Sequence, residues 1–201
     1  MKFTGMEKVG ELIQLNVLFV LCGLPIVTLG ASATALHYAL RRRAEGKGGV
    51  VGDFLRAFRE NLRQATILWL CALALGAGLG LNFWLISGWT GPALLPAAAL
   101  LGLGTFALLV WTAVVFPLLA RFDNTTGATA KNALILALGS PLRSLAAAAL
   151  NIAPFVLAAL LPELFLLAGF LWLFLLCAVS ALAAQKLFAP LFARLERAAG
   201  D

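Results

Sequence analysis

The chain has 201 residues, of which 62% are hydrophobic and 12% are charged, and its mean hydropathy is +0.98. Soluble domains carry roughly 45–50% apolar and about 25% charged residues, so this composition excludes a water-soluble protein and predicts an integral membrane protein. The net charge of +6 is explained by the preference for Lys and Arg in cytoplasmic loops, and we expect no nucleic acid partner.

Residues 1–50 form the first predicted segment, and residues 12–40 within it contain no Asp, Glu, Lys or Arg. A membrane-spanning helix needs about 20 apolar residues, so this run is long enough to cross once. The stretch CGLPIVTLGAS contains two glycines and a proline, which disfavour a continuous helix. Two alternatives remain. A single crossing over 12–30, which we prefer, leaves the N-terminus outside, and a re-entrant pair at about 8–22 and 32–43 keeps every basic residue inside.

The next predicted element is an amphipathic helix at residues 53–63, DFLRAFRENLR. A helical projection places its phenylalanines and leucines on one arc and its arginines on another, which is typical of a helix lying in the membrane interface. We expect a cytoplasmic elbow helix whose arginines face anionic lipid headgroups, and a helix that binds a protein partner is the alternative. Six arginines of this elbow and the loop before it are expected at the membrane surface: Arg41, Arg42, Arg43, Arg56, Arg59 and Arg63.

Two helical hairpins are predicted after the elbow. Residues 64–120 carry no charged side chain and are long enough for two spans joined by the turn SGWTGPALLP. Residues 144–185 carry only Glu163 and predict two more spans, joined by LLPEL. Because these turns lack Lys and Arg while the other loops are basic, we expect the turns outside and the loops, with the C-terminus, in the cytoplasm. The predicted fold is an all-α polytopic transmembrane helix bundle of about five spans.

A short motif occurs twice, as PLLARFD at 117–123 and as PLFARLE at 190–196, each time at the end of a hairpin. We interpret residues 51–123 and 124–201 as two related units, each an elbow helix followed by a hairpin. Both units start and end on the cytoplasmic side, so the repeat is parallel, with its axis along the membrane normal. Convergence of two similar helix ends is the alternative. Four residues are expected at equivalent cytoplasmic helix ends: Pro117, Arg121, Pro190 and Arg194.

A stripe of small residues marks the first hairpin. Ala72, Gly76 and Gly80 are spaced four apart, which places them on one face of a helix. Small residues at this spacing let a second helix approach closely. The stripe predicts a helix-packing surface, and either an internal helix or another subunit fits it.

The sequence offers few groups for chemistry. It contains one His and nine acidic residues, and it lacks a GxxxxGK[ST] phosphate-binding loop, so we expect no enzyme, no cofactor and no metal. No ionisable residue lies in the middle of a predicted span, which disfavours ion-coupled transport. Five side chains leave a case for a sugar path, with hydrogen bonding between helices as the alternative role: Gln14, Asn16, Asn82, Asn151 and Trp172.

Three stretches, NVLFVLCGLPIVTLGASATALHYAL, DFLRAFRENLRQATILWL and FPLLARFDNT, occur in an order that resembles the YesL family of small bacterial membrane proteins. The family's opening pattern is matched by Asn16, Pro25, Thr28, Gly30, Ala35 and Leu36. The resemblance covers most of the chain, least in its last third. It implies a bacterial inner-membrane protein of a family without an established reaction, whose genes often neighbour those of carbohydrate ABC importers.

Three functions are considered on this basis. The preferred hypothesis is a non-enzymatic accessory or regulatory partner of a carbohydrate ABC importer permease, in contact with the lipid bilayer and its anionic lipids. The second is a sugar or other small-solute transporter, or a channel, with a polar path between the repeats. The third is a lipid-contacting scaffold. A second copy of the chain is a further candidate partner.

Overall fold

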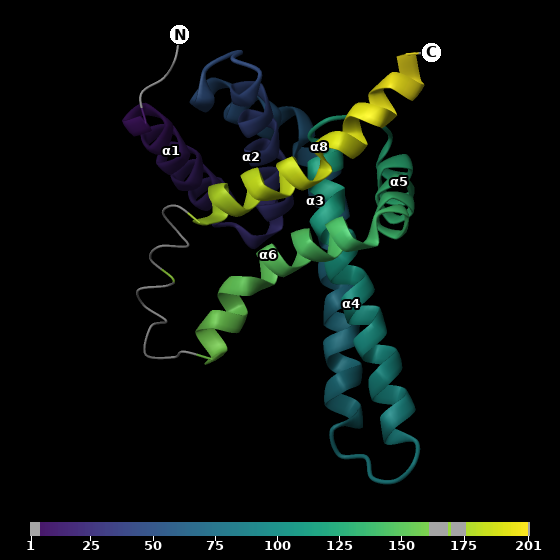
Figure 1. The fold of residues 1–201 in the computed structure, drawn as a ribbon. Coiled ribbons are helices and arrows are strands. Elements are labelled where there is room, and N and C mark those ends of the chain that lie inside the picture. The colour runs from purple at the N-terminus through teal and green to yellow at the C-terminus, as the bar shows by residue number, and fades with distance from the viewer. Residues whose placement is uncertain (1–4, 161–168, 170–175, 201) are drawn as a thin grey trace.

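The computed structural model of the chain describes residues 5–160, 169 and 176–200, and its regular elements are all helical (Figure 1). This confirms the predicted all-α class for the described residues. Their helices are α1 (Gly5–Gly23), the 3₁₀ helix η1 (Ile26–Thr28), α2 (Leu29–Ala44), α3 (Val50–Ile86), α4 (Leu94–Leu119), α5 (Thr126–Gly139), α6 (Pro141–Leu160) and α8 (Cys177–Gly200).

Among the described helices, α3 and α4 are each long and apolar enough to cross a membrane. The pair α5 and α6 adds a third candidate span if it is counted as one segment, although the two helices are bent by 108° at their junction. The expectation of about five spans is therefore confirmed only as far as two or three spans.

The N-terminal segment is a helical pair folded back on itself, so residues 12–30 do not form the one continuous helix that the preferred single crossing implies. Glu11 near the start of α1 forms an ion pair with Arg43 at the end of α2, which makes the two helices antiparallel. The chain breaks after Gly23, because Pro25 has no N–H to continue the helical ladder. The Thr28 hydroxyl lies 2.6 Å from the Cys22 carbonyl oxygen and 2.8 Å from that of Pro25. The broken alternative, at 8–22 and 32–43, describes these helices.

The folded-back pair is held against α3 by a close backbone approach and a side-chain hydrogen bond. Gly30 of α2 lies so near α3 that an added Cβ atom would stand 2.7 Å from the carbonyl oxygen of Ala65 and 2.7 Å from Cβ of Trp69. The indole N–H of Trp69 donates to the Ile26 carbonyl at 2.6 Å. The Thr-x-Gly motif therefore has a structural role, because only glycine fits at this crossing.

Residues 53–63 do not form a separate elbow helix, because α3 runs without a break from Val50 to Ile86. The predicted separation of apolar and charged faces is present: Phe54 and Ala57 are buried against α1 and α2, whereas Arg56, Arg59 and Arg63 are exposed. The apolar face of this segment packs against other helices of the protein. The segment is therefore the first part of the long helix α3 and not a helix lying flat in the membrane interface.

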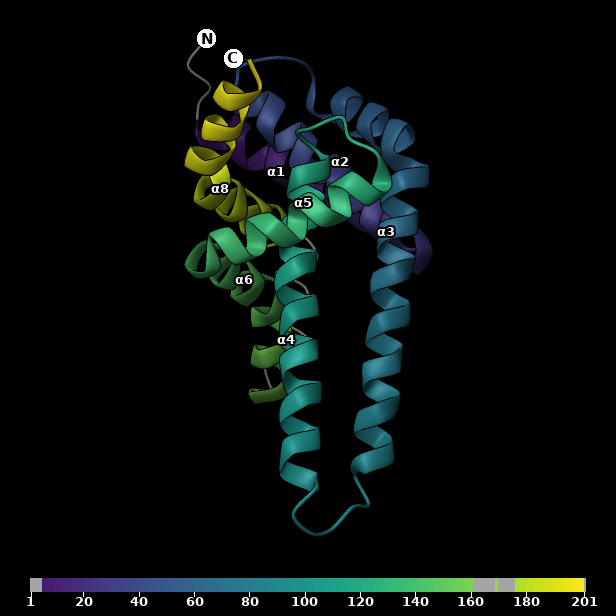
Figure 2. The same cartoon turned by 90° about the vertical axis from the view of Figure 1, so that its right-hand side faces the viewer.

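The first predicted hairpin is confirmed, and it extends beyond the other described helices (Figure 2). In the second half, α6 and α8 run obliquely to the α3–α4 pair (Figure 1), and residues 161–164 of the predicted turn LLPEL lie outside the described residues. The second elbow is a separate helix, α5, bent sharply against α6, whereas α3 joins elbow and span in one helix. The two halves thus differ in their elbows, and the duplication is not confirmed.

A buried amide joins the two ends of the chain. The Oδ1 atom of Asn16, on α1, accepts a hydrogen bond of 2.6 Å from the backbone N–H of Ala178. This N–H belongs to the first turn of α8, where backbone donors have no partner within their own helix. Asn16 is completely buried, so it caps α8 across the core and fixes the start of that helix against α1.

Replacing Gly30 with alanine is expected to destabilise the fold. The new Cβ would overlap the α3 backbone, and overpacking of this kind costs about 1–3 kcal/mol. The free energy of unfolding of the full chain in detergent measures the loss. Gly102→Ala is the matched control, because Gly102 of α4 has no atom within 4 Å of an added Cβ. Equal effects of the two substitutions would contradict the close approach.

The folded-back pair also predicts membrane topology. In Figure 1 the start of α1 and the α2–α3 loop lie at one end of the molecule, and the α3–α4 turn lies at the other. Single cysteines replacing Gly10 and Gly46 should react with an impermeant thiol reagent from the same side, and one replacing Gly91 from the opposite side. The native cysteines are first replaced by serine. Opposite accessibility of positions 10 and 46 would restore the single-crossing alternative.

Candidate functional site

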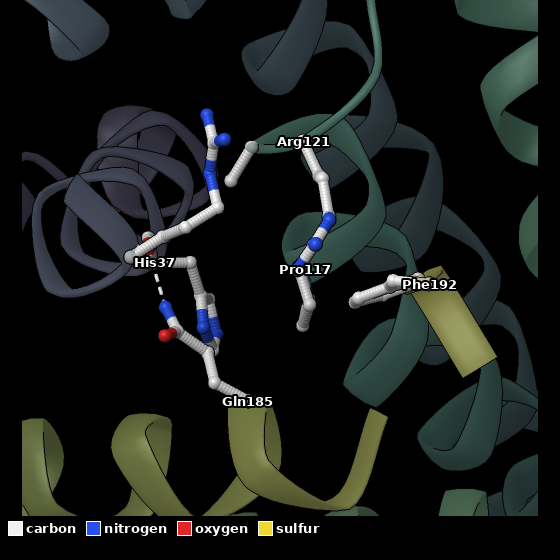
Figure 3. A pocket seen from close by; sticks show the side chains of 7 residues that line it. His37, Pro117, Arg121, Gln185 and Phe192 are labelled. Atoms are coloured by element: carbon white, nitrogen blue, oxygen red, sulfur yellow. Dashed lines mark hydrogen bonds between the residues drawn. The ribbon is translucent and has the colours of Figure 1, made fainter. Parts of the chain in front are cut away.

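The two copies of the repeated motif meet each other in space, at a junction formed by α2, the end of α4, and α8 (Figure 3). A small cavity of about 20 Å³ lies there, which is room for about one water molecule. Its lining comes from these three segments: His37, Arg41, Pro117, Ala120, Arg121, Gln185 and Phe192.

An ion pair closes one side of the junction. The Nε and Nη2 atoms of Arg121 donate to the two carboxylate oxygens of Glu196 at 2.7 and 3.0 Å, and the guanidinium lies 5.3 Å from the ring centroid of Phe192. Arg121 belongs to the first copy of the motif, and Glu196 and Phe192 belong to the second. The hydrogen bonds from Arg121 hold the pKa of the Glu196 carboxyl below its ordinary 4.5.

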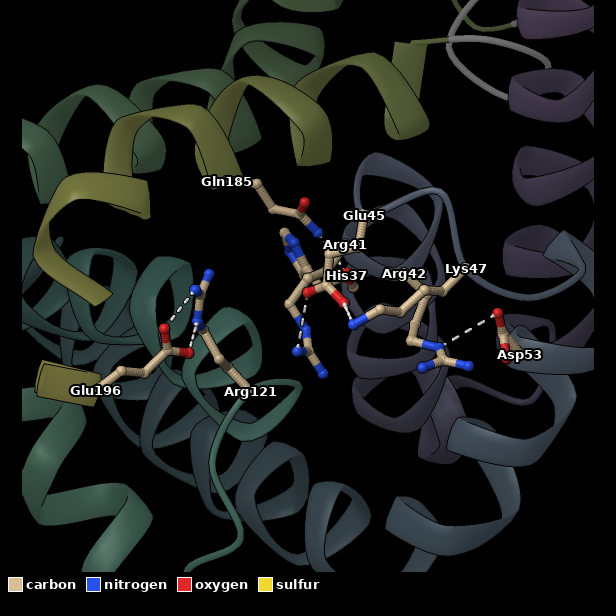
Figure 4. A network of polar contacts seen from close by, with 9 residues as sticks. All are labelled: His37, Arg41, Arg42, Glu45, Lys47, Asp53, Arg121, Gln185 and Glu196. Carbon is tan, nitrogen blue, oxygen red and sulfur yellow. Dashed lines mark hydrogen bonds and ion pairs between the residues drawn. The ribbon is translucent and has the colours of Figure 1, made fainter. Parts of the chain in front are cut away.

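The opposite side of the junction carries polar atoms without partners. The side-chain amide of Gln185, on α8, donates to the backbone carbonyl of His37 (Figures 3 and 4). Two buried nitrogen atoms, Nδ1 of His37 and Nε of Arg41, have no hydrogen-bond partner among the described residues. Nε of Arg41 is an obligatory donor, and its Nη1 reaches only the exposed Glu45, at 3.4 Å. The junction is therefore incompletely satisfied on the side of α2.

A second, much larger cavity lies beside the junction, with a volume of about 850 Å³. Residues of α1, α2, α3, α4, α6 and α8 line it, and most of them are apolar. The polar groups on its wall include His37, Thr112, Asn151 and Ser180. His37 and Pro117 line both cavities, so the small polar cavity and the large apolar cavity share a wall.

The six predicted surface arginines divide into two groups. Arg41, Arg42 and Arg43 at the end of α2 form ion pairs with Glu45, Asp53 and Glu11, respectively (Figure 4 shows the first two). Arg56, Arg59 and Arg63 on α3 are exposed. Arg42 and Arg43 therefore join α2 to α3 and α1, Arg41 pairs at the end of its own helix, and the second group stands on the surface.

The four repeat residues are not equivalent. Pro117 lies in the last turn of α4 and Arg121 follows its end, as predicted. Pro190 lies inside α8, which continues past Arg194 to Gly200, so the placement of Arg194 at a helix end is wrong. Pro190 is exposed, and α8 continues through it even though proline has no N–H for the helical ladder.

The predicted stripe of small residues faces the large cavity. Ala72 and Gly76 line that cavity, and an added Cβ at Gly80 would meet no atom within 4 Å. An added Cβ at Gly76 would stand 3.6 Å from Leu108 of α4, and one at Gly104 of α4 would stand 3.1 Å from Leu79 of α3. Side chains of α4 thus meet the stripe at Gly76 and leave it open at Gly80.

Three long-range contacts were not predicted from the sequence: the hydrogen bonds of Gln185, Glu196 and Gln64. The Gln64 amide donates to the Asn124 carbonyl at 2.8 Å and to the Thr129 hydroxyl at 3.1 Å, which fixes the α4–α5 loop. Isolated polar residues at the ends of apolar runs were the only available signal. Within the described residues, no group of three or more His, Cys, Asp or Glu side chains could hold a metal ion.

Comparison with known proteins finds a family match for part of the chain. Residues 12–83 match a family described as a protein of unknown function, DUF624. The matched region runs from α1 through the folded-back pair into α3, and it includes Gly30 and Trp69. No curated protein matches the chain, and no solved structure matches it.

Breaking the ion pair between Arg121 and Glu196 should slightly lower the stability of the fold. Arg121→Gln is expected to lower the free energy of unfolding by roughly 0.2–1 kcal/mol, the range for solvent-accessible pairs. Arg194→Gln is the control, because Arg194 is exposed and forms no ion pair in the structure described. Since the pKa of Glu196 is lowered, the contribution should be complete above pH 4.5 and disappear as the pH falls below it. Equal losses in both variants, measured by unfolding in detergent, would argue for a symmetric repeat.

Proposed function

We propose that this chain is a non-enzymatic, multi-pass protein of the bacterial inner membrane that works as an accessory partner of another membrane protein. The observation that carries the proposal is the free-standing α3–α4 hairpin. It extends beyond the other described helices (Figure 2), and an added Cβ would meet nothing within 4 Å at Gly78, Gly80 or Gly102. Open glycines on a membrane-embedded helix leave room for the backbone of a second helix.

The identity of the partner rests on resemblance. The DUF624 match over residues 12–83 supports the resemblance to YesL proteins, which are of that family. The YesL resemblance in turn suggests a carbohydrate ABC importer, so the partner of our proposal is the importer's permease. In this proposal the basic loops and the C-terminus face the cytoplasm, which is supported by the exposure of Arg56, Arg59 and Arg63 in the first part of α3, far from the α3–α4 turn.

A second candidate function is transport through the large cavity. The cavity lies between α3–α4 and α6–α8, where the polar path was expected, and Asn151 lines it. The other proposed polar residues support this path poorly: Asn16 caps α8, Asn82 donates to Gly78 of its own helix, and Gln14 is exposed. Trp172 lies outside the described residues. A mainly apolar wall leaves sugar hydroxyls unpaired, so transport of a sugar ranks second.

The accessory role predicts a sharp difference between two glycine variants. Gly80→Leu should abolish co-purification of an importer permease in mild detergent, because leucine fills the open face of the hairpin. Gly127→Leu should retain it, because that equally open glycine lies on α5, outside the α3–α4 helices themselves. Mass spectrometry of the purified complex measures the outcome, with unfolding temperature as a check on both variants. Absence of any importer component from the wild-type preparation would refute the proposal, and sugar uptake by liposomes holding the chain alone would favour transport.

A further inference from the structure

The two cavities together have the shape and chemistry of a site for an amphipathic molecule. His37 and Pro117 form their common wall, so a polar end and an apolar end adjoin each other within one structure. The polar end lies among the basic residues at the end of α2, and the apolar end extends toward the α3–α4 hairpin. This inference does not depend on the identity of the partner proposed above.

The polar end is suited to an anionic oxygen atom. Its volume of about 20 Å³ holds one water-sized group. The Nε–H of Arg41 points at no acceptor among the described residues, and Nδ1 of His37 is also unpartnered. Arg121 lines the same space, and its bidentate pair with Glu196 fixes its orientation and compensates its charge, so Arg41 is the cation available to a ligand. A charge-assisted hydrogen bond from Arg41 would satisfy a donor that is otherwise buried at a cost.

The apolar end is suited to a hydrocarbon chain. Its volume of about 850 Å³ falls within the range of about 300–1,000 Å³ typical of ligand sites, and its wall is mainly apolar. The wall includes exposed side chains, Leu73 and Ala77 of α3 and Leu109 of α4, so the cavity is open on the side of the hairpin. A site open at a membrane-embedded hairpin is reached from the hydrocarbon of the bilayer. An unfilled apolar cavity of this size would forfeit the dispersion contacts of its lining.

We propose that this composite site binds an acidic phospholipid of the cytoplasmic leaflet. One phosphate oxygen occupies the small cavity beside Arg41 and His37, and one acyl chain lies in the large cavity. The charges decide the lipid class, because the polar end presents two arginines, of which only Arg121 is matched by a bidentate carboxylate. The bilayer supplies such a molecule in the required orientation, with its headgroup at the basic end.

The test measures thermal stabilisation of the purified full chain by phosphatidylglycerol, by phosphatidylcholine with the same acyl chains, and by inorganic phosphate. Phosphatidylglycerol should raise the unfolding temperature most, and inorganic phosphate should not raise it. Arg41→Gln should raise the phosphatidylglycerol concentration for half-maximal effect about tenfold, as expected for the loss of one charge-assisted hydrogen bond. Arg59→Gln, which removes an exposed arginine outside the site, should leave that concentration unchanged.

Two matched substitutions on α3 test the apolar end of the site. Ala77→Phe places a ring in the cavity and should weaken the effects of both lipids, whereas Ala74→Phe, an exposed position outside the cavity wall, should weaken neither. Equal stabilisation by the two lipids, equal effects of Arg41→Gln and Arg59→Gln, or no difference between the two phenylalanine variants would each overturn the proposal. Stabilisation by inorganic phosphate would assign the polar end to a free anion. Occupation by a second copy would appear as a dimer insensitive to phosphatidylglycerol.

Discussion

The fold depends on one constraint: backbone groups freed by the break between α1 and α2 must find partners within the protein, because a hydrocarbon environment offers none. Carbonyl oxygens around the break accept hydrogen bonds from three side chains: Thr28, Ser32 and Trp69. Trp69 belongs to α3, so the bonds that satisfy the break also fix α2 against α3, where Gly30 lets the backbones touch. The end of α2, with its arginines, is thereby placed beside α4 and α8, and the two cavities form around His37.

The two copies of the repeated motif have similar sequences but different structural roles. In a symmetric pair, the contact of Arg121 with Glu196 would be repeated by Arg194 with Asp123, and the described residues show no such second pair. The reason is that α4 ends beside Arg121, while α8 continues past Arg194. One copy supplies the guanidinium and the other supplies the carboxylate and the Phe192 ring, which also packs edge-on against Phe122. The two similar stretches therefore form one contact with unlike partners.

Local features were predictable from the sequence, and long-range contacts were not. Apolar run lengths predicted α3, α4 and their turn, and the arcs of residues 53–63 separated buried Phe54 from exposed Arg56. The break at Pro25 was visible, but composition could not decide between crossing and folding back. That choice rests on contacts such as Glu11 with Arg43, between residues 32 positions apart. The cavities were beyond prediction, because Asn16 and Gln185 reach their partners over more than 140 residues and no periodic pattern encodes such pairs.

The arginines form one cluster in the sequence but have different surroundings in the structure. Counted along the chain, Arg41–Arg43 and the three arginines of α3 are one basic cluster that predicts a cytoplasmic loop. In space, each of the first three meets an acid from a different place: Glu45 in the following loop, Asp53 at the start of α3, and Glu11 on α1. Asp53 is almost fully buried, so its pairing with Arg42 ties the α2–α3 connection to the core. Removing these arginines would loosen the junction as well as change the topology signal, whereas removing Arg59 would change the surface charge alone. The sequence cluster thus contains arginines that pair with acids and arginines that stand exposed, and the proposed lipid site adjoins one of the first kind, Arg41.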